Sequence, residues 1–133
     1  MRGMKNVRIT LYGIPNCDTV KKSRAWMTEH ALDYEFHDFK KQGVPADRAS
    51  AWTKALGWEK LLNRQGTTWR KLDAATQATV QDDASARAVM QLYPSTIKRP
   101  VVEWEVEGHD EPQIHVGFAP QQWRRLLDTQ NED

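Results

Sequence analysis

The sequence predicts an α/β fold in which a helical insertion separates the second and third strands of a mixed four-stranded sheet. Three observations lead to this prediction: strand and helix patterns alternate in the first third of the chain, helical patterns fill the middle, and strand patterns return near the end. The 133 residues, 39% of them hydrophobic, suit one compact domain. We expect a single domain over residues 1–133, with the insertion at about residues 42–95.

The first third of the chain predicts a β-α-β unit. Apolar and polar side chains alternate over residues 7–12, which indicates a strand. Gly13 and Pro15 break this pattern, and a helix is predicted from Asp18 onward. The predicted inner face of this helix consists of Val20, Ser23, Met27 and Ala31. A second short strand is predicted over residues 33–38.

The middle of the chain predicts several helices. One helix opens near Pro45 and is stopped by Gly57, and a later one is capped by Asp82 or Asp83. The predicted inner face of the later helix consists of Ser85, Ala88, Val89 and Leu92. Residues 63–71 lie between these helices, lack a helical period, and are predicted to form a loop.

The last third predicts a hairpin and a helix. Strands are predicted over residues 100–106 and 113–116, and a final helix begins at Pro120. Without the insertion, the element order is βαβ followed by ββα, which is the order of the thioredoxin fold. We therefore expect a thioredoxin-like fold, with the insertion as a lid or cap beside the site.

Composition and charge exclude several function classes. One cysteine cannot form an intrachain disulfide or a cysteine-rich zinc site, and the four histidines show no metal-ligand spacing. A net charge of +1 with dispersed Lys and Arg gives no support for nucleic acid binding. No apolar stretch approaches the roughly 18 residues of a membrane span. We expect a cytoplasmic monomer with no bound cofactor and no nucleic acid or membrane partner.

Cys17 is the first candidate catalytic residue, because it lies where the first strand gives way to the first helix. Unpaired N–H groups and the positive end of the helix dipole at that junction stabilise a thiolate, which is the nucleophilic form. Lys21, one turn further on, would add positive charge, whereas Asp18 would oppose the thiolate. The alternative is a small buried apolar cysteine, against which the polar, turn-forming residues 15–18 argue.

Two further segments are candidates. The Arg99–Pro100 bond precedes a strand and is predicted to be cis, in a segment that lies opposite the cysteine in thioredoxin folds and exposes backbone for glutathione or an extended peptide. The loop over residues 63–71 contains Arg64, Trp69 and Arg70, and arginine binds oxyanions and carboxylates with paired hydrogen bonds. The alternative for these loop residues is a solvated surface.

Four segments resemble the arsenate reductase-related (ArsC/Spx) family of thioredoxin-fold proteins, in its bacterial YffB-like branch: LYGIPNCDTVKKSRAWM, GWEKLLNRQGTTWRKLD, IKRPVVEW and HVGFAPQQW. The resemblance implies that Cys17 is a nucleophile and that Arg99 matches one of three oxyanion-binding arginines, with Arg64 an approximate second match. It also implies glutathione as the external thiol and glutaredoxin as a partner that resets the enzyme.

The chain departs from the arsenate enzymes in ways that disfavour arsenate. Gly117 stands at the position of the third arginine, and Gly13–Ile14 replaces a histidine-asparagine pair. Each lost charge-assisted hydrogen bond costs about 1.5–3 kcal/mol. The regulator branch, which binds RNA polymerase, carries a Cys-x-x-Cys redox switch. Val20 stands at the second cysteine's position here, so no internal disulfide can form.

The sequence therefore predicts a thiol oxidoreductase with one nucleophilic cysteine, and more specifically a glutathione-dependent thiol reductase. Glutathione would lie along Arg99–Pro100 and resolve the Cys17 adduct. Positive charge at the site would come from Lys21, Arg64, Arg70 and Arg99. One alternative is a non-enzymatic protein that binds RNA polymerase through the insertion, and another is an arsenate reductase.

Overall fold

The computed structural model describes residues 6–130, and the chain divides into two compact units. The first unit comprises the described residues up to His37 together with those from Arg99 onward. The second unit is Asp38–Lys98, which contains the helices between the second and third strands.

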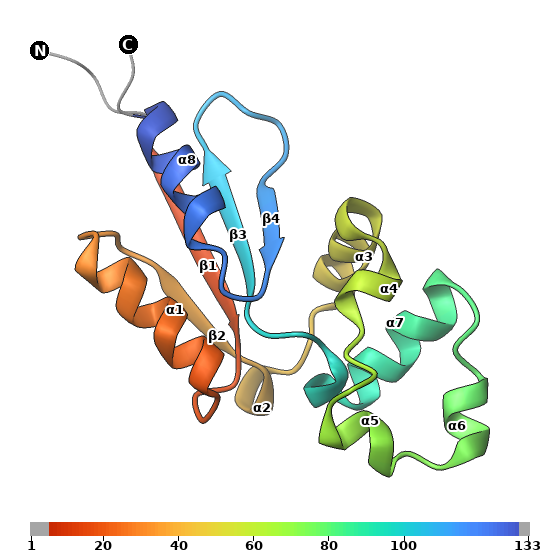
Figure 1. Ribbon diagram of the computed structural model, residues 1–133. Coiled ribbons are helices and arrows are strands. Elements are labelled where there is room, and N and C mark those ends of the chain that lie inside the picture. The colour runs from red at the N-terminus through yellow and green to blue at the C-terminus, as the bar shows by residue number, and fades with distance from the viewer. Residues whose placement is uncertain (1–5, 131–133) are drawn as a thin grey trace, which may run out of the picture. The chain divides into compact units, whose positions relative to one another are not determined.

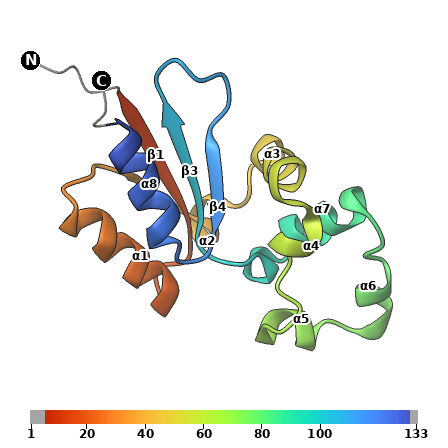
Figure 2. The same ribbon diagram turned by 45° about the horizontal axis from the view of Figure 1, so that its top comes forward.

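The first unit is built on a mixed four-stranded sheet, as predicted. Its elements are the strands β1 (Val7–Gly13), β2 (Glu35–Asp38), β3 (Val101–Val106) and β4 (Gln113–Val116), and the helices α1 (Asp18–Glu29) and α8 (Pro120–Gln130). The strand order is β2-β1-β3-β4, with β3 antiparallel to both β1 and β4. Both helices cover the same face of the sheet (Figures 1 and 2). This arrangement confirms the expected thioredoxin-like fold.

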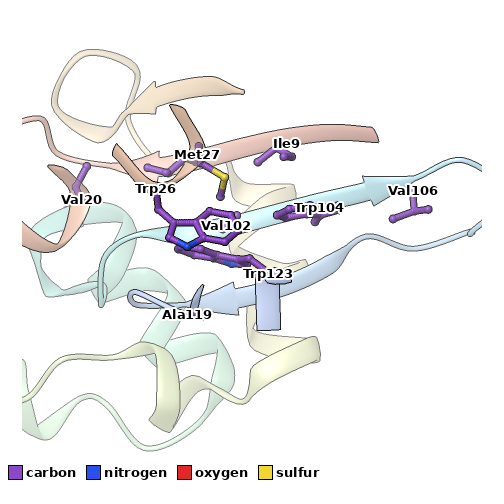
Figure 3. Packing of buried hydrophobic residues seen from close by; sticks show 10 residues of the cluster. Ile9, Val20, Trp26, Met27, Val102, Trp104, Val106, Ala119 and Trp123 are labelled. Atoms are coloured by element: carbon purple, nitrogen blue, oxygen red, sulfur yellow. The ribbon is translucent and has the colours of Figure 1, made fainter. Parts of the chain in front are cut away.

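The core of the first unit lies between the sheet and its two helices. The period of two in the strands and of three to four in the helices places the apolar side chains on the facing surfaces. The buried members are Ile9, Leu11, Val20, Trp26, Met27, Val102, Trp104, Val106, Ala119 and Trp123. The rings of Trp26 and Trp123 lie 5.4 Å apart and join α1 to α8 (Figure 3). This continuous core fixes α1, and with it the residues at its N-terminus.

The C-terminal end of α1 differs from the prediction. The predicted inner-face residue Ala31 is exposed and has a φ of 56°, because the helix ends at Glu29 and the chain turns there. His30 instead stacks on Trp26, with ring centroids 3.8 Å apart. The Nε2 atom of His30 lies 3.1 Å from an Arg124 nitrogen, and arginine only donates, so Nε2 accepts and Nδ1 donates to the Trp26 carbonyl at 2.8 Å. These contacts tie the end of α1 to α8.

The second unit is helical. Its elements are α2 (Phe39–Gln42), α3 (Ala46–Leu56), α4 (Trp58–Leu61), α5 (Thr67–Lys71), α6 (Ala74–Ala78), α7 (Asp83–Leu92) and the 3-10 turn η1 (Pro94–Thr96). Trp52 is fully buried at its centre, and its ring lies 6.1 Å from that of Phe39. An isolated bridge pairs Leu62 with Ile97, and it joins the segment after α4 to the end of the unit.

Two predictions for the second unit are wrong. Residues 67–71 form the helix α5, whereas a loop was expected there; none of its side chains is buried, so the helix leaves no hydrophobic period in the sequence. The inner face of α7 is also rotated from the predicted one. Ala86, Val89 and Met90 are buried, whereas Leu92 is 74% exposed. Ser85 and Asp82 form a capping box at the N-terminus of α7, so the Ser85 side chain serves the helix terminus and not the buried face.

Candidate functional site

The junction between β1 and α1 positions Cys17. The residue is the N-cap of α1, with extended backbone and a half-buried side chain. Its carbonyl accepts the first helical hydrogen bond, from the Lys21 N–H at 2.9 Å. An N-cap side chain points toward the unpaired N–H groups of the first helical turn, so the sulfur lies where a negative charge is stabilised.

The antiparallel pairing of β1 with β3 brings a second residue to the same end of the sheet. Tyr12, near the end of β1, pairs with Val101, the first residue of β3. The segment that leaves β1 toward Cys17 and the segment that enters β3 from Arg99 therefore lie at the same end of the sheet. The side chain of Arg99 forms a hydrogen bond with Cys17. The sheet register thus explains why residues 82 positions apart meet at one sulfur.

Burial and three neighbouring groups act on the ionisation of Cys17. Burial by itself raises the pKa of the Cys17 thiol. The Val20 N–H, the hydrogen bond and positive charge of Arg99, and the Thr19 N–H all stabilise the thiolate and outweigh burial. The pKa of the thiol consequently lies below its ordinary value, which increases the share of the nucleophilic thiolate at a given pH.

The segment that carries Arg99 is held in place by β4. The Arg99–Pro100 peptide bond is cis, as predicted, and Pro100 is buried. The Pro100 carbonyl accepts a hydrogen bond of 2.8 Å from the Gly117 N–H, just after β4. This hydrogen bond links the residue that follows β4 to the residue that precedes β3. It was not predicted, because nothing in the local sequence around Gly117 indicates its partner.

Two lysines, Lys21 and Lys22, lie in the first half of α1. Lys21 is exposed and lies four residues after Cys17, on the same side of the helix. Lys22 is also exposed, and its Nζ lies 5.1 Å from the ring centroid of Phe118. The first unit thus contains Cys17, Lys21, Arg99 and Pro100 of the predicted site.

The other predicted site residues belong to the second unit. Arg64 is exposed, with its guanidinium 5.2 Å from the ring centroid of Trp58. Trp69 and Arg70 lie on α5, where the Trp69 carbonyl accepts a hydrogen bond of 2.8 Å from Gln77. A role for Arg64, Trp69 and Arg70 in binding a substrate stays a prediction.

No cluster of three or more His, Cys, Asp or Glu side chains among residues 6–130 could hold a metal ion. None of the helices described there is long and apolar enough to cross a membrane.

The fold and this site define a thioredoxin-like protein whose candidate reactive group is one cysteine at the β1–α1 junction, opposite an arginine and a cis-proline. The ArsC family model matches residues 12–126, and the chain belongs to the ArsC family. The resemblance found in the sequence is thereby confirmed.

Three similar proteins illustrate the range of this family. The solved structure of the YFFB protein is 44% identical, has a TM-score of 0.79, and the match covers 90% of this chain and 98% of that one. An arsenate reductase (ArsC) related protein from Brucella melitensis is 46% identical with a TM-score of 0.63, covering 90% and 94%. The global transcriptional regulator Spx of Staphylococcus saprophyticus is 24% identical over 121 residues, covering 90% and 86%.

Proposed function

We propose that this protein is a thiol oxidoreductase, and specifically a glutathione-dependent thiol reductase of the cytoplasm. The observation that carries the proposal is the set of groups around Cys17: Arg99 and the N–H groups of Thr19 and Val20 all stabilise its thiolate. A thiolate is the attacking form in thiol–disulfide exchange. The similarity to an arsenate reductase-related protein supports a redox role for this chain.

The proposed reaction has two exchange steps. The Cys17 thiolate attacks the glutathione sulfur of a mixed disulfide, forms a Cys17–glutathione disulfide and releases the substrate thiolate. A second glutathione thiolate then attacks the glutathione sulfur of this adduct, which releases glutathione disulfide and restores the Cys17 thiolate. In the net reaction the substrate sulfur is reduced from the disulfide to the thiolate level and the sulfur of the incoming glutathione is oxidised to the disulfide level, whereas Cys17 and the glutathione sulfur of the mixed disulfide end at the level at which they began.

The need for an external thiol follows from the residues of α1. Cys17 is the only cysteine in the chain, and Val20 occupies the position from which a second cysteine could resolve the adduct. Glutathione carries carboxylates, for which Arg99 and Lys21 offer positive charge. We assign the same role to Arg64 and Arg70 of the second unit, with Trp69 as an apolar contact. Pro100 fixes the segment along which glutathione is proposed to lie, and glutaredoxin is the proposed partner for resetting Cys17.

The test is adduct formation with a glutathionylated peptide. The reduced protein should acquire one glutathionyl group on Cys17, visible by mass spectrometry, and excess glutathione should remove it. The thiol should also titrate below about 8.5, the value of an unperturbed cysteine. Absence of the adduct together with titration near that value would overturn the proposal.

A second candidate function is partner binding without catalysis. It is favoured by the similarity to the Spx regulator over most of the chain. Leu92 and Tyr93, at the end of α7, are exposed large apolar residues in the second unit. Retention of stoichiometric RNA polymerase by the Cys17→Ser variant, with no turnover by the wild type, would establish this candidate instead.

Arsenate reduction is the remaining candidate, and Gly117 argues against it. Glycine supplies no guanidinium at the position where the arsenate enzymes carry their third arginine. Arsenate-dependent oxidation of glutathione by the purified protein would decide the matter, and we expect none above background.

A further inference from the structure

Gly13, the last residue of β1, is in close contact with a side chain of α1. A Cβ added at Gly13 would lie 2.8 Å from one methyl carbon of Val20 and 3.6 Å from the other. The first distance is far inside van der Waals contact. The φ angle of Gly13 is not positive, so the backbone conformation at this position is one that alanine adopts. The side chain of Val20, and not the backbone conformation, therefore requires glycine at this position.

Val20 connects this contact to the sulfur. Its side chain is fully buried in the core of the first unit (Figure 3), and its N–H, in the first turn of the helix that Cys17 caps, is among the groups that stabilise the Cys17 thiolate. A valine in a helix has essentially one χ1 rotamer, so its methyl groups cannot swing away from Gly13. Any group added at Gly13 must displace the backbone of the first turn of α1, which also includes Thr19, whose N–H likewise stabilises the thiolate.

We propose that Gly13 and Val20 form a positioning pair, whose close contact sets the first turn of α1 against the end of β1 and so holds the Thr19 and Val20 N–H groups at the Cys17 sulfur. The inference rests on the proposed function, since it concerns how the nucleophile of that reaction is prepared. Hydrogen bonds weaken steeply as distance and angle depart from their optimum, so a small displacement of the turn is enough to matter.

A purely structural role makes a different prediction. If the glycine only avoids a clash, then Gly13→Ala lowers stability and leaves the ionisation of Cys17 unchanged. If the pair positions the donors, then thiol ionisation changes, and restoring the space restores ionisation. The two methyl groups of Val20 are removed by Val20→Ala, which keeps the backbone N–H of this residue.

The experiment compares the full-length wild type with Gly13→Ala, Val20→Ala and the double variant. The pH dependence of Cys17 alkylation by iodoacetamide is measured, because this small neutral probe needs no glutathione site. Gly13→Ala should raise the pH at half-maximal rate and slow alkylation at pH 7 by about tenfold, the value of one weakened hydrogen bond to a charged group. Val20→Ala alone, which removes the contact, should shift the profile in the same direction, whereas the double variant, in which the added Cβ at position 13 takes up space left by the lost methyl groups, should react within about threefold of the wild type.

Val106→Ala is the matched control, because Val106 belongs to the same core but pairs with Val7 at the opposite end of the sheet. It should lower the melting temperature and leave the alkylation profile unchanged. If Gly13→Ala does not fold, recovery of both folding and the wild-type profile in the double variant supports the proposal.

The proposal is overturned if Gly13→Ala alkylates like the wild type, or if a folded double variant stays slow. If the variants alkylate as expected but the wild type forms no glutathione adduct, the proposed function is contradicted and the positioning pair is still supported.

Discussion

The two units bury their largest side chains equally well but hold their candidate site residues differently. Trp104 in the first unit and Trp52 in the second are both fully buried. Cys17, however, caps a helix of 12 residues that is anchored in a core, and Arg99 lies two residues before the largely buried strand β3. Arg70 lies on α5, a helix of five residues with no buried side chain.

This difference separates preorganised groups from adaptable ones. A helix of little more than one turn has no stability of its own, since nucleation costs more than one turn of hydrogen bonds returns. The Cys17 donors are fixed before any ligand arrives, whereas the long side chains Arg64 and Arg70 must lose rotamer freedom to bind one. We therefore expect the intrinsic reactivity to come from the first unit and the second unit to contribute recognition.

The strongest test of this comparison is removal of the nucleophile. Cys17→Ser should abolish both alkylation and the glutathione adduct, because no other thiol is present. The side chain is half-buried and the substitution is nearly isosteric, so the melting temperature should change little. Residual adduct on the variant, detected by mass spectrometry, would mean that the chemistry lies elsewhere in the chain.

The next largest effect is expected from the core that anchors α1. Trp104→Ala should cost about 3–5 kcal/mol of unfolding free energy, measured by urea denaturation, because it leaves a large cavity under the sheet. The matched control is Leu92→Ala, which removes a side chain that is 74% exposed and should change stability by less than about 0.5 kcal/mol. Equal costs for the two would contradict the burial found for these side chains.

Much of this fold was predictable because its strongest signals are local. β1, β3, α1 and α8 each carry a clear hydrophobic period, and the predicted thioredoxin-like order is confirmed. The exposed helix α5 could not be recognised, because without a buried face it has no period to detect. The exposure of Leu92 was missed for a related reason: the orientation of α7 is decided by its cap and its packing neighbours.

The same distinction between local sequence signals and tertiary packing applies to the candidate site. Cys17 and the Arg99–Pro100 segment were predictable, from a strand-to-helix junction and from the family resemblance. The contact between Gly13 and Val20 was not, since it depends on how closely a helix approaches the strand before it. The Gly117 bond to Pro100 likewise follows from the pairing of β3 with β4 and from no local pattern.

The preorganised half of the site is sharpened by Arg99→Gln. This variant loses the charge and weakens the hydrogen bond at the Cys17 thiolate, so the pKa of the thiol should rise. A hydrogen bond to a charged group is worth about 1.5–3 kcal/mol, so alkylation at pH 7 should slow by roughly 10- to 100-fold. Stopped-flow alkylation across pH measures both changes. An unchanged profile would show that the backbone donors alone stabilise the thiolate.

The adaptable half is tested by Arg64→Gln and Arg70→Gln. Both side chains are exposed, and exposed ion pairs contribute about 0.2–1 kcal/mol. We expect each variant to raise the KM for glutathione by roughly two- to fivefold, with iodoacetamide alkylation of Cys17 unchanged. A change in the alkylation profile would contradict the assignment of intrinsic reactivity to the first unit alone, because it would place these arginines among the groups that affect ionisation of the thiol.

The smallest expected effect is the contribution of the Cys17 thiolate to stability, and its sign is fixed by the direction of the pKa shift. The pKa of the thiol is lower in the folded chain than in the unfolded one, so the folded state binds fewer protons between the two values. The thiolate therefore stabilises the fold fully above about pH 8.5, the ordinary value, and this contribution is lost as the pH falls through the lowered folded value.

Urea midpoints of the wild type and of Cys17→Ser, compared from pH 5 to 9.5, isolate this contribution because serine does not titrate in that range. The urea midpoint of the wild type should increase relative to that of Cys17→Ser as the pH rises. Trp52→Ala, in the other unit, leaves Arg99 and the Thr19 and Val20 N–H groups in place, and the gain should persist in that background. A gain of opposite sign would mean that burial dominates the ionisation of Cys17 and that its thiol, not its thiolate, is the form the first unit stabilises.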